Sequence, residues 1–220
     1  MIKPLLIKTS YVFIAILLCG HAISQNEINI EGSQVISNFK FVNSSGLIDK
    51  DYLSITGGAY GLSYQRTTKK NLLFKVGAGM RKAGSTLTIS NDNYSWQLQY
   101  IDAKISIGYM LNKWRLKPYI MLTPYYSFLT KAYQTVNTQN YDMVKNKTIK
   151  NSDYGVNGSF GIKVTLSDLF SIYAEGSYLY GLQNNEVNTK QKLYNRAYFI
   201  TLGATIKISK LSPKWLQEGK

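Results

Sequence analysis

The chain is poor in the side chains on which much protein chemistry depends. Its 220 residues include one histidine, His21, and one cysteine, Cys19, so an intrachain disulfide cannot form. Without imidazole and thiol ligands only scattered carboxylates remain, and no calcium-loop spacing occurs among them, so we expect no metal and no cofactor. Four prolines stand against 17 glycines, a balance that suits strands and turns better than linkers.

Long apolar runs are also missing, and the longest one belongs to an expected export signal. Two lysines precede the run 11–18, which is well short of the roughly 20 residues that a spanning helix needs. The small-x-small triplet Ala22-Ile23-Ser24 follows it. We expect cleavage after Ser24, which makes residues 1–24 a signal peptide and removes the only histidine and cysteine. Lipidation of Cys19 is the alternative, although lipoprotein signals place a small residue where Leu18 stands.

Acidic residues are few: 12 Asp and Glu against 26 Lys and Arg, for a net charge of +14. The cations are spread over turns, loops and strand interiors, and an export signal precedes them. We therefore expect no nucleic-acid partner. An anionic membrane surface is the better match, and outer-membrane lipid with lipopolysaccharide is the expected lipid partner.

What the chain does have is an alternation of apolar and polar residues, with a period of two residues. In the stretch 169–182, Phe170 and Ile172 share one parity with other apolar residues, while Ser171 and Glu175 lie on the other. Seven further stretches show the same alternation, and we expect strands at 33–43, 55–66, 72–82, 96–111, 116–133, 153–166, 169–182 and 196–208. The assignment of faces is weakest in the first strand.

The segments between these strands are alternately long and short. Four long loops on one side, with three tight turns and both termini on the other, are typical of bacterial outer-membrane barrels. We therefore predict an all-β protein, an eight-stranded antiparallel up-and-down transmembrane β-barrel after a cleaved signal peptide. Residues 25–32 would be a periplasmic N-terminal lead, residues 33–208 the outer-membrane barrel, and residues 209–220 a periplasmic C-terminal tail.

Four stretches carry a family resemblance: Tyr100 to Tyr109, Lys117 to Tyr126, Asp153 to Ile162, and Ile172 to Leu182. Together they resemble the PorT-like outer-membrane β-barrel proteins of Gram-negative bacteria, small porin-like barrels. The resemblance covers nearly all of the chain after the signal. It implies a cell-envelope role, in some members linked to protein secretion or gliding, and no enzyme activity.

Charged residues recur on the polar parity, which a membrane barrel turns inward. An eight-stranded barrel is just wide enough for its own side chains, so we expect these charges to neutralise one another in a network instead of lining a pore. A small pore or transport barrel is the alternative. The expected lumen charge network is Lys75, Arg81, Asp102, Lys104, Lys163, Glu175 and Lys207.

With little lumen, specific activity is expected in the long polar loops at 134–152 and 183–195. These loops offer side chains suited to anionic headgroups or to a partner protein of the envelope or a secretion system. The candidate interaction residues are Tyr141, Lys145, Lys147, Lys150, Lys190, Lys192 and Tyr194.

The sequence thus predicts a non-enzymatic outer-membrane barrel with an envelope, surface-contact or secretion-accessory role. A lipid-modifying enzyme is a second hypothesis, but such chemistry generally uses a histidine base, which the processed chain lacks. A soluble, lipocalin-like periplasmic binder would show the same period of two. Short turns confined to one side and tyrosines at strand ends favour the membrane barrel over that third hypothesis.

Overall fold

We analysed a computed structural model of the chain, which describes residues 25–89, 91–111, 115–187 and 190–208. The expected signal peptide, its cleavage site and the tail 209–220 lie outside the described residues.

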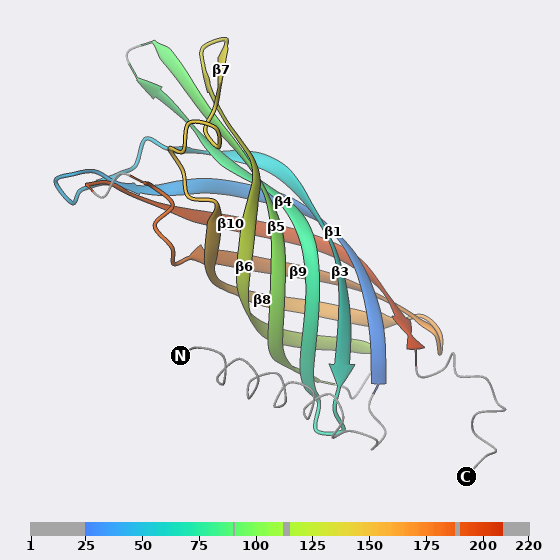
Figure 1. The fold of residues 1–220 in the computed structure, drawn as a ribbon. Coiled ribbons are helices and arrows are strands. Elements are labelled where there is room, and N and C mark those ends of the chain that lie inside the picture. Colours follow the sequence, from blue (N-terminus) through green and yellow to red (C-terminus); the bar gives the residue numbers. More distant parts are fainter. Residues whose placement is uncertain (1–24, 90, 112–114, 188–189, 209–220) are drawn as a thin grey trace, which may run out of the picture.

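Eight long strands form the body of the molecule (Figure 1). They are β1 (Gln25–Val42), β3 (Leu53–Thr67), β4 (Leu72–Ile89), β5 (Asp92–Met110), β6 (Leu116–Val136), β8 (Ser152–Thr165), β9 (Phe170–Gly181) and β10 (Lys192–Lys207). Two short strands, β2 (Ile48–Asp49) and β7 (Gln139–Asp142), pair with β1 and β6. Each long strand pairs antiparallel with the next one along the chain, and β10 pairs with β1. The sheet therefore closes, and the predicted eight-stranded antiparallel β-barrel is confirmed.

The expected alternation of faces holds along most strands. In β9, Phe170 and Ile172 are exposed on the outside, whereas Ser171 and Tyr173 are buried inside. The outer surface carries large apolar side chains such as Ile105, Phe160 and Leu202, of which 53%, 57% and 67% is exposed. An apolar exterior around a polar interior inverts the arrangement of a soluble barrel and is the pattern of a barrel embedded in lipid.

The first strand begins earlier than the sequence analysis expects. Residues 25–32 are not a lead outside the barrel, because β1 starts at Gln25 and its first residues already pair with both β3 and β10. Its inward positions there are Glu27, Asn29 and Glu31, buried or half-buried. A run of acids and amides looks like a polar leader in sequence, yet these side chains supply partners for interior cations.

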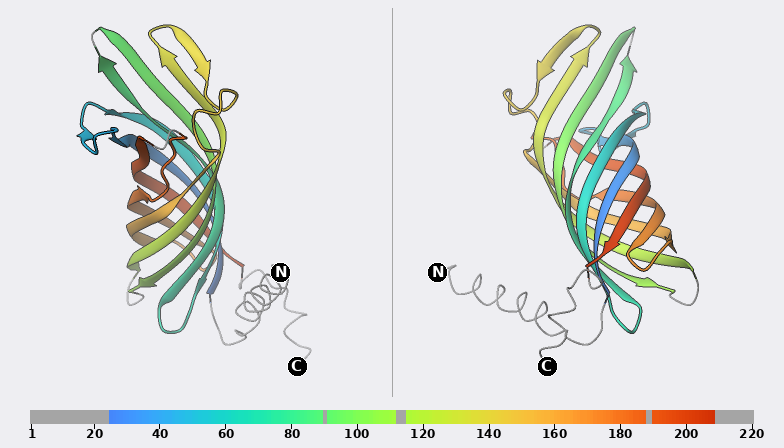
Figure 2. Two further views of the ribbon diagram at one scale, coloured as in Figure 1. Left: turned by 60° about the vertical axis from the view of Figure 1, so that its left-hand side comes forward. Right: turned by 90° about the vertical axis from the view of Figure 1, so that its right-hand side faces the viewer.

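The connections define two ends of the barrel. We call the end with the β3–β4, β5–β6 and β8–β9 connections the turn end, and the opposite end the loop end. The segment 83–95, expected as a long loop, is instead a hairpin in which β4 and β5 continue to Ile89 and Asp92. The segment 134–152 contains β7, which folds back on β6. Figure 2 shows both hairpins rising above the barrel at the loop end.

Several interior side chains lie over a glycine of the neighbouring strand. Tyr119 is the register partner of Gly161, and a Cβ at that glycine would stand 2.3 Å from the tyrosine ring. Tyr173 and Gly203 form the same kind of pair, with 2.2 Å between the ring and such a Cβ. These glycines therefore make room for inward tyrosines in a narrow barrel.

Candidate functional site: a filled interior and an aromatic cup at the loop end

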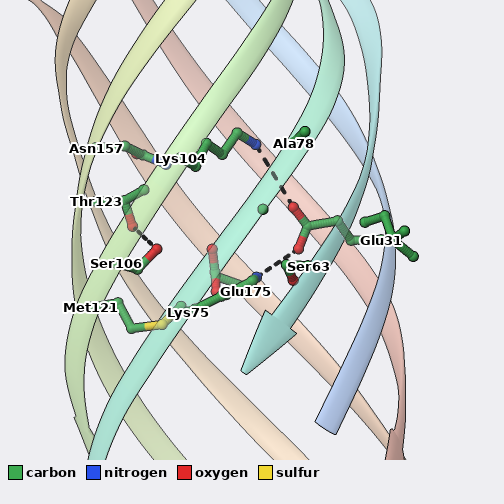
Figure 3. A pocket seen from close by; sticks show the side chains of 12 residues that line it. Glu31, Ser63, Lys75, Ala78, Lys104, Ser106, Met121, Thr123, Asn157 and Glu175 are labelled. Atoms are coloured by element: carbon green, nitrogen blue, oxygen red, sulfur yellow. Dashed lines mark hydrogen bonds and ion pairs between the residues drawn. The ribbon is translucent and has the colours of Figure 1, made fainter. Parts of the chain in front are cut away.

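The middle of the interior is organised around Glu31 of β1. Its carboxylate accepts hydrogen bonds from Lys75 Nζ at 2.7 Å and from the Tyr173 hydroxyl at 2.8 Å. Lys104 Nζ lies 3.7 Å from its other oxygen (Figure 3). The second carboxylate nearby, Glu175, accepts a hydrogen bond from the Tyr119 hydroxyl at 2.9 Å. Two lysines and two tyrosines thus surround two carboxylates contributed by β1 and β9.

A second group, nearer the loop end, is centred on Arg81. Its Nε lies 3.1 Å from Asp102 Oδ2, and its Nη2 donates to Ser127 at 3.1 Å and lies 3.6 Å from Asp153 Oδ2. The guanidinium also lies 4.6 Å from the centroid of the Tyr100 ring. Both the arginine and its two carboxylates are almost fully buried, so this ion pair is shielded from bulk water.

A third group closes the turn end. Lys163 Nζ donates to Glu27 Oε2 at 2.5 Å, and Gln65 donates to the same oxygen at 3.0 Å. Lys207, the register partner of Glu27 on β10, is buried beside them.

All seven residues of the expected lumen network point inward, but they fall into these three separate groups. Three acidic residues of these groups are missing from the expected network: Glu27, Glu31 and Asp153. The first two were hidden by the wrong start of β1. Ile28 and Ile30 alternate with them and could have revealed the strand.

Little space is left between these groups. Two voids of about 30 Å³ each adjoin Glu31, Lys104 and Glu175, which is room for one or two water molecules. Toward the turn end an apolar cluster accompanies the Lys163–Glu27 pair, with Leu73 and Met110 buried against Tyr119 and Tyr173. Toward the loop end it is again apolar, around Phe39, Leu98 and Tyr100. Charged layers between apolar layers leave no wide channel through the described part of the barrel.

The inward position of Phe39 departs from the expected rule that apolar residues face outward. It is 3% exposed and packs against Tyr52 and Trp96, with ring centroids 6.4 and 6.2 Å away. Near the loop end the strands extend beyond the apolar exterior belt, and the interior there is filled by aromatic side chains instead of ion pairs. Apolar side chains therefore face inward near both ends of the barrel, and the interior is polar mainly in its middle.

Above this aromatic layer lies a cup of about 250 Å³ that opens at the loop end. Phe41, Tyr52 and Trp96 form its aromatic side, with Tyr52 lying 5.3 and 5.5 Å from the other two rings. Burial, helped by the nearby charges of Asp49 and Glu186, raises the pKa of Tyr52 to about 12, so its phenol stays neutral. The remaining lining residues are Phe39, Gln134, Met143, Thr148, Ile149, Glu186, Gln191 and Leu193.

None of the expected loop residues is among the residues that line this cup. Tyr141 lies on β7, 44% exposed, and Lys145, Lys147 and Lys150 are exposed in the following segment. Lys190 is exposed before β10.

Two of the candidates are not loop residues, which corrects the sequence prediction. Lys192 and Tyr194 lie on β10, opposite Val42 and Lys40 of β1. The segment 134–152 is also more structured than the polar loop that we expected. Ile149 is 5% exposed, faces the cup and forms a β-bridge with Glu186.

Nothing in this geometry resembles a metal centre. Within the described ranges, no three acidic, histidine or cysteine side chains gather closely enough to hold an ion. The side chains around the cup can bind a ligand noncovalently through aromatic faces, amides, hydroxyls and one carboxylate.

A closed antiparallel barrel of eight long strands with an apolar exterior is the fold of the small outer-membrane β-barrel proteins. Solved structures of that class share it. The outer-membrane protein OprG of Pseudomonas aeruginosa has 11% sequence identity and a TM-score of 0.54, over 82% of this chain and 95% of that one. A major outer-membrane protein of Thermus thermophilus has 12% identity and a TM-score of 0.52, over 84% and 99%. In sequence, the chain matches no protein-family model and no curated protein.

Proposed function

We propose that this protein is a non-enzymatic integral β-barrel of the bacterial outer membrane that works by binding a partner at its loop end. One observation carries the proposal: the interior is filled by ion pairs and apolar layers, whereas a space of about 250 Å³ lined by four aromatic rings opens at the loop end. A barrel built this way offers a surface for contact and no path for solutes.

The membrane placement is supported by the exterior. Isoleucine, leucine and phenylalanine side chains remain exposed around the barrel, and exposing such an apolar belt to water would be costly. Lipid removes that cost, and an export signal at the N-terminus would deliver the chain to the outer membrane.

The physiological role that we propose is an envelope, surface-contact or secretion-accessory function of the kind found among PorT-like barrels. The expected partners are outer-membrane lipid, including lipopolysaccharide, and a protein of the envelope or of a secretion system. The absence of any histidine or cysteine after His21 supports a role without catalysis.

Site-specific photocrosslinking in the envelope tests the proposal. A photoreactive residue at Thr148, on the cup wall, should capture a defined partner, and Trp96→Ala should abolish the capture because it removes one aromatic side of the cup. Tyr60→Ala, which removes a 64% exposed aromatic ring from the outer wall, is the matched control and should leave capture intact.

Two results would contradict the proposal. Equal capture from the two variants would show that the cup is not the contact surface. Large, stable conductance of the purified protein in planar bilayers would favour a pore. Heat-modifiable migration of each variant verifies that its barrel is folded.

A further inference from the structure

The wall of the barrel is interrupted between β3 and β4, close to the loop end. The two strands pair from Thr67 opposite Leu73 up to Ala59 opposite Arg81, and pairing resumes at Ser54 opposite Ser85. Four residues of β3, 55–58, therefore face three residues of β4, 82–84, and the strands form a bulge there.

Part of the missing ladder is replaced by a side chain from β1. The Gly84 amide donates to Ser37 Oγ at 2.9 Å, and that hydroxyl donates to the Gly84 carbonyl at 3.2 Å. Both backbone groups of Gly84 therefore have a partner at the interruption. Gly84 also has a φ of +159° and lies so close to the Trp96 carbonyl that a Cβ would stand 1.9 Å from its oxygen.

A recess of about 400 Å³ occupies this part of the wall. Gly57 and Gly58 of β3 form one side of it, and its lining reaches inward to Ala83 and Leu98, which are buried. The two glycines place no side chain in the recess.

Two lysines lie on the outer side of the recess. Lys82 of β4 is the register partner of Gln99 of β5, which is in turn the partner of Lys131 of β6. Neighbouring positions in an antiparallel ladder are about 5 Å apart, so two exposed ammonium groups flank one amide. No aspartate or glutamate is among the residues that line this recess, so its charge is positive.

The lysine row lies directly above the apolar belt. The next outward row toward the turn end consists of Met80, Ile101 and Phe128, which are register partners and all exposed. From Leu72, where β4 begins, ten residues lead to Lys82, about 34 Å along a strand and about 25 Å along the axis of a tilted barrel. That height matches the apolar band of outer-membrane barrels, so the recess lies at the level of the headgroups on the loop side.

We propose that this recess is a binding site for the phosphate-bearing headgroup of an anionic lipid in the leaflet on the loop side. Lys82 and Lys131 would contact the phosphate, Gln99 would hydrogen-bond the headgroup, and Tyr133 would lie beside it at the interface. The inference depends on the membrane placement proposed above and adds a particular lipid site on the wall, distinct from the aromatic cup.

The full-length protein, folded into phosphatidylcholine nanodiscs doped with bisphosphorylated lipid A, tests the site. Native mass spectrometry of the released protein counts retained lipid A adducts. The double variant K82Q/K131Q should lower retention by on the order of tenfold or more, because each lysine near an anionic surface contributes independently. The matched control K69Q/K70Q removes two exposed lysines of the β3–β4 turn and should retain lipid A as the natural chain does.

Equal retention by the two double variants would overturn the site. Displacement of lipid A by millimolar inorganic phosphate would show that the recess takes free phosphate and not a lipid headgroup. If K145Q/K147Q caused the loss instead, the headgroup would belong to the loops. Failure of the natural chain to enter nanodiscs in a heat-modifiable form would contradict the membrane placement itself, and is therefore distinguishable from failure of the site.

Discussion

At the scale of single residues, the three interior ion groups differ in how well water reaches them. The side chains of Arg81 and Asp102 are 1% and 2% exposed, whereas that of Lys104 is 27% exposed and lies 3.7 Å from Glu31. A buried charge that loses its partner has no solvent to replace it, whereas a half-exposed one does. The Arg81 group should therefore dominate the electrostatic contribution to stability.

Neutralising Asp102 tests this difference. Asp102→Asn leaves Arg81 with the more distant Asp153 and should lower the free energy of unfolding by about 3–5 kcal/mol. Lys104→Gln should cost about 1 kcal/mol or less. Urea titrations of the protein folded in lipid vesicles measure both values, and similar losses from the two variants would mean that water reaches Arg81 as readily as Lys104.

The sequence could predict which residues point inward but not which ones meet. The alternation of faces along each strand is enough to place Lys75, Arg81 and Lys163 in the lumen. The pairing of Lys163 with Glu27 joins β8 to β1, residues 136 apart, and depends on where β1 starts and on how the barrel closes. The offset between strands around the barrel depends on the registers of all eight strand pairs together, so the sequence pattern of one strand cannot predict it.

At the scale of the strand, exterior and interior positions tolerate change for different reasons. Ile105 faces lipid, so Ile105→Arg should cost about 2–4 kcal/mol if it lies near the bilayer midplane, while Ile105→Leu should be nearly neutral. Folding titrations into vesicles check the pair. Equal stability of the two variants would argue against lipid at this face.

The structure changes one expectation about the opposite face. The sequence pattern alone predicts that an arginine at a lumenal position such as Ser106 or Thr205 is less destabilising than one at Ile105. Both are buried, however: Ser106 accepts a hydrogen bond from Thr123, and Thr205 donates one to Asn29. A filled interior has no room for a long side chain, so an arginine at either position should be destabilising as well.

Glycines within one strand offer a sharper test of interior packing. In β8, Gly161 lies under the Tyr119 ring, while a Cβ at Gly158 would meet nothing within 4 Å. Gly161→Ala should lower the free energy of unfolding by about 1–3 kcal/mol through overpacking, and should disturb the hydrogen bond from Tyr119 to Glu175. Gly158→Ala is the control in the same strand and should change little. Denaturant midpoints in vesicles decide between them, and equal midpoints would show that the tyrosine moves aside freely.

The positions of the strands were largely predictable, because a strand that crosses lipid alternates apolar and polar side chains. The ends of the strands were not predictable, because the sequence need not alternate outside the apolar belt. Residues 83–95 and 134–152 are polar, and nothing in their composition distinguishes the observed hairpins from open loops. The same reason hides the aromatic cup, whose rings come from β1, β5 and the segment before β3.

At the scale of the whole molecule, the layers of the interior act in series. A solute entering from the loop end would meet the aromatic layer around Phe39, then the Arg81 group and the Glu31 group, and finally the apolar layer around Met110 together with the Lys163–Glu27 pair at the turn end. The voids between them hold about 30 Å³ each, less than a hydrated ion needs. Crossing would require several buried contacts to open at once, each of which stabilises the closed barrel.

We therefore expect the purified protein to show no large, stable conductance in planar bilayers, although it inserts and folds. Enlarging the space in one layer should not open a conducting path, because the other layers still block it. Tyr119→Ala opens space only near the turn end and should give no measurable current. The triple variant with Arg81→Ala and Phe39→Ala removes one bulky side chain from each of three layers and should produce measurable current if the barrel still folds. Heat-modifiable migration verifies folding of each variant. Stable current from the natural chain, or from Tyr119→Ala alone, would show that the layers do not close the barrel independently and would favour the alternative of a small pore.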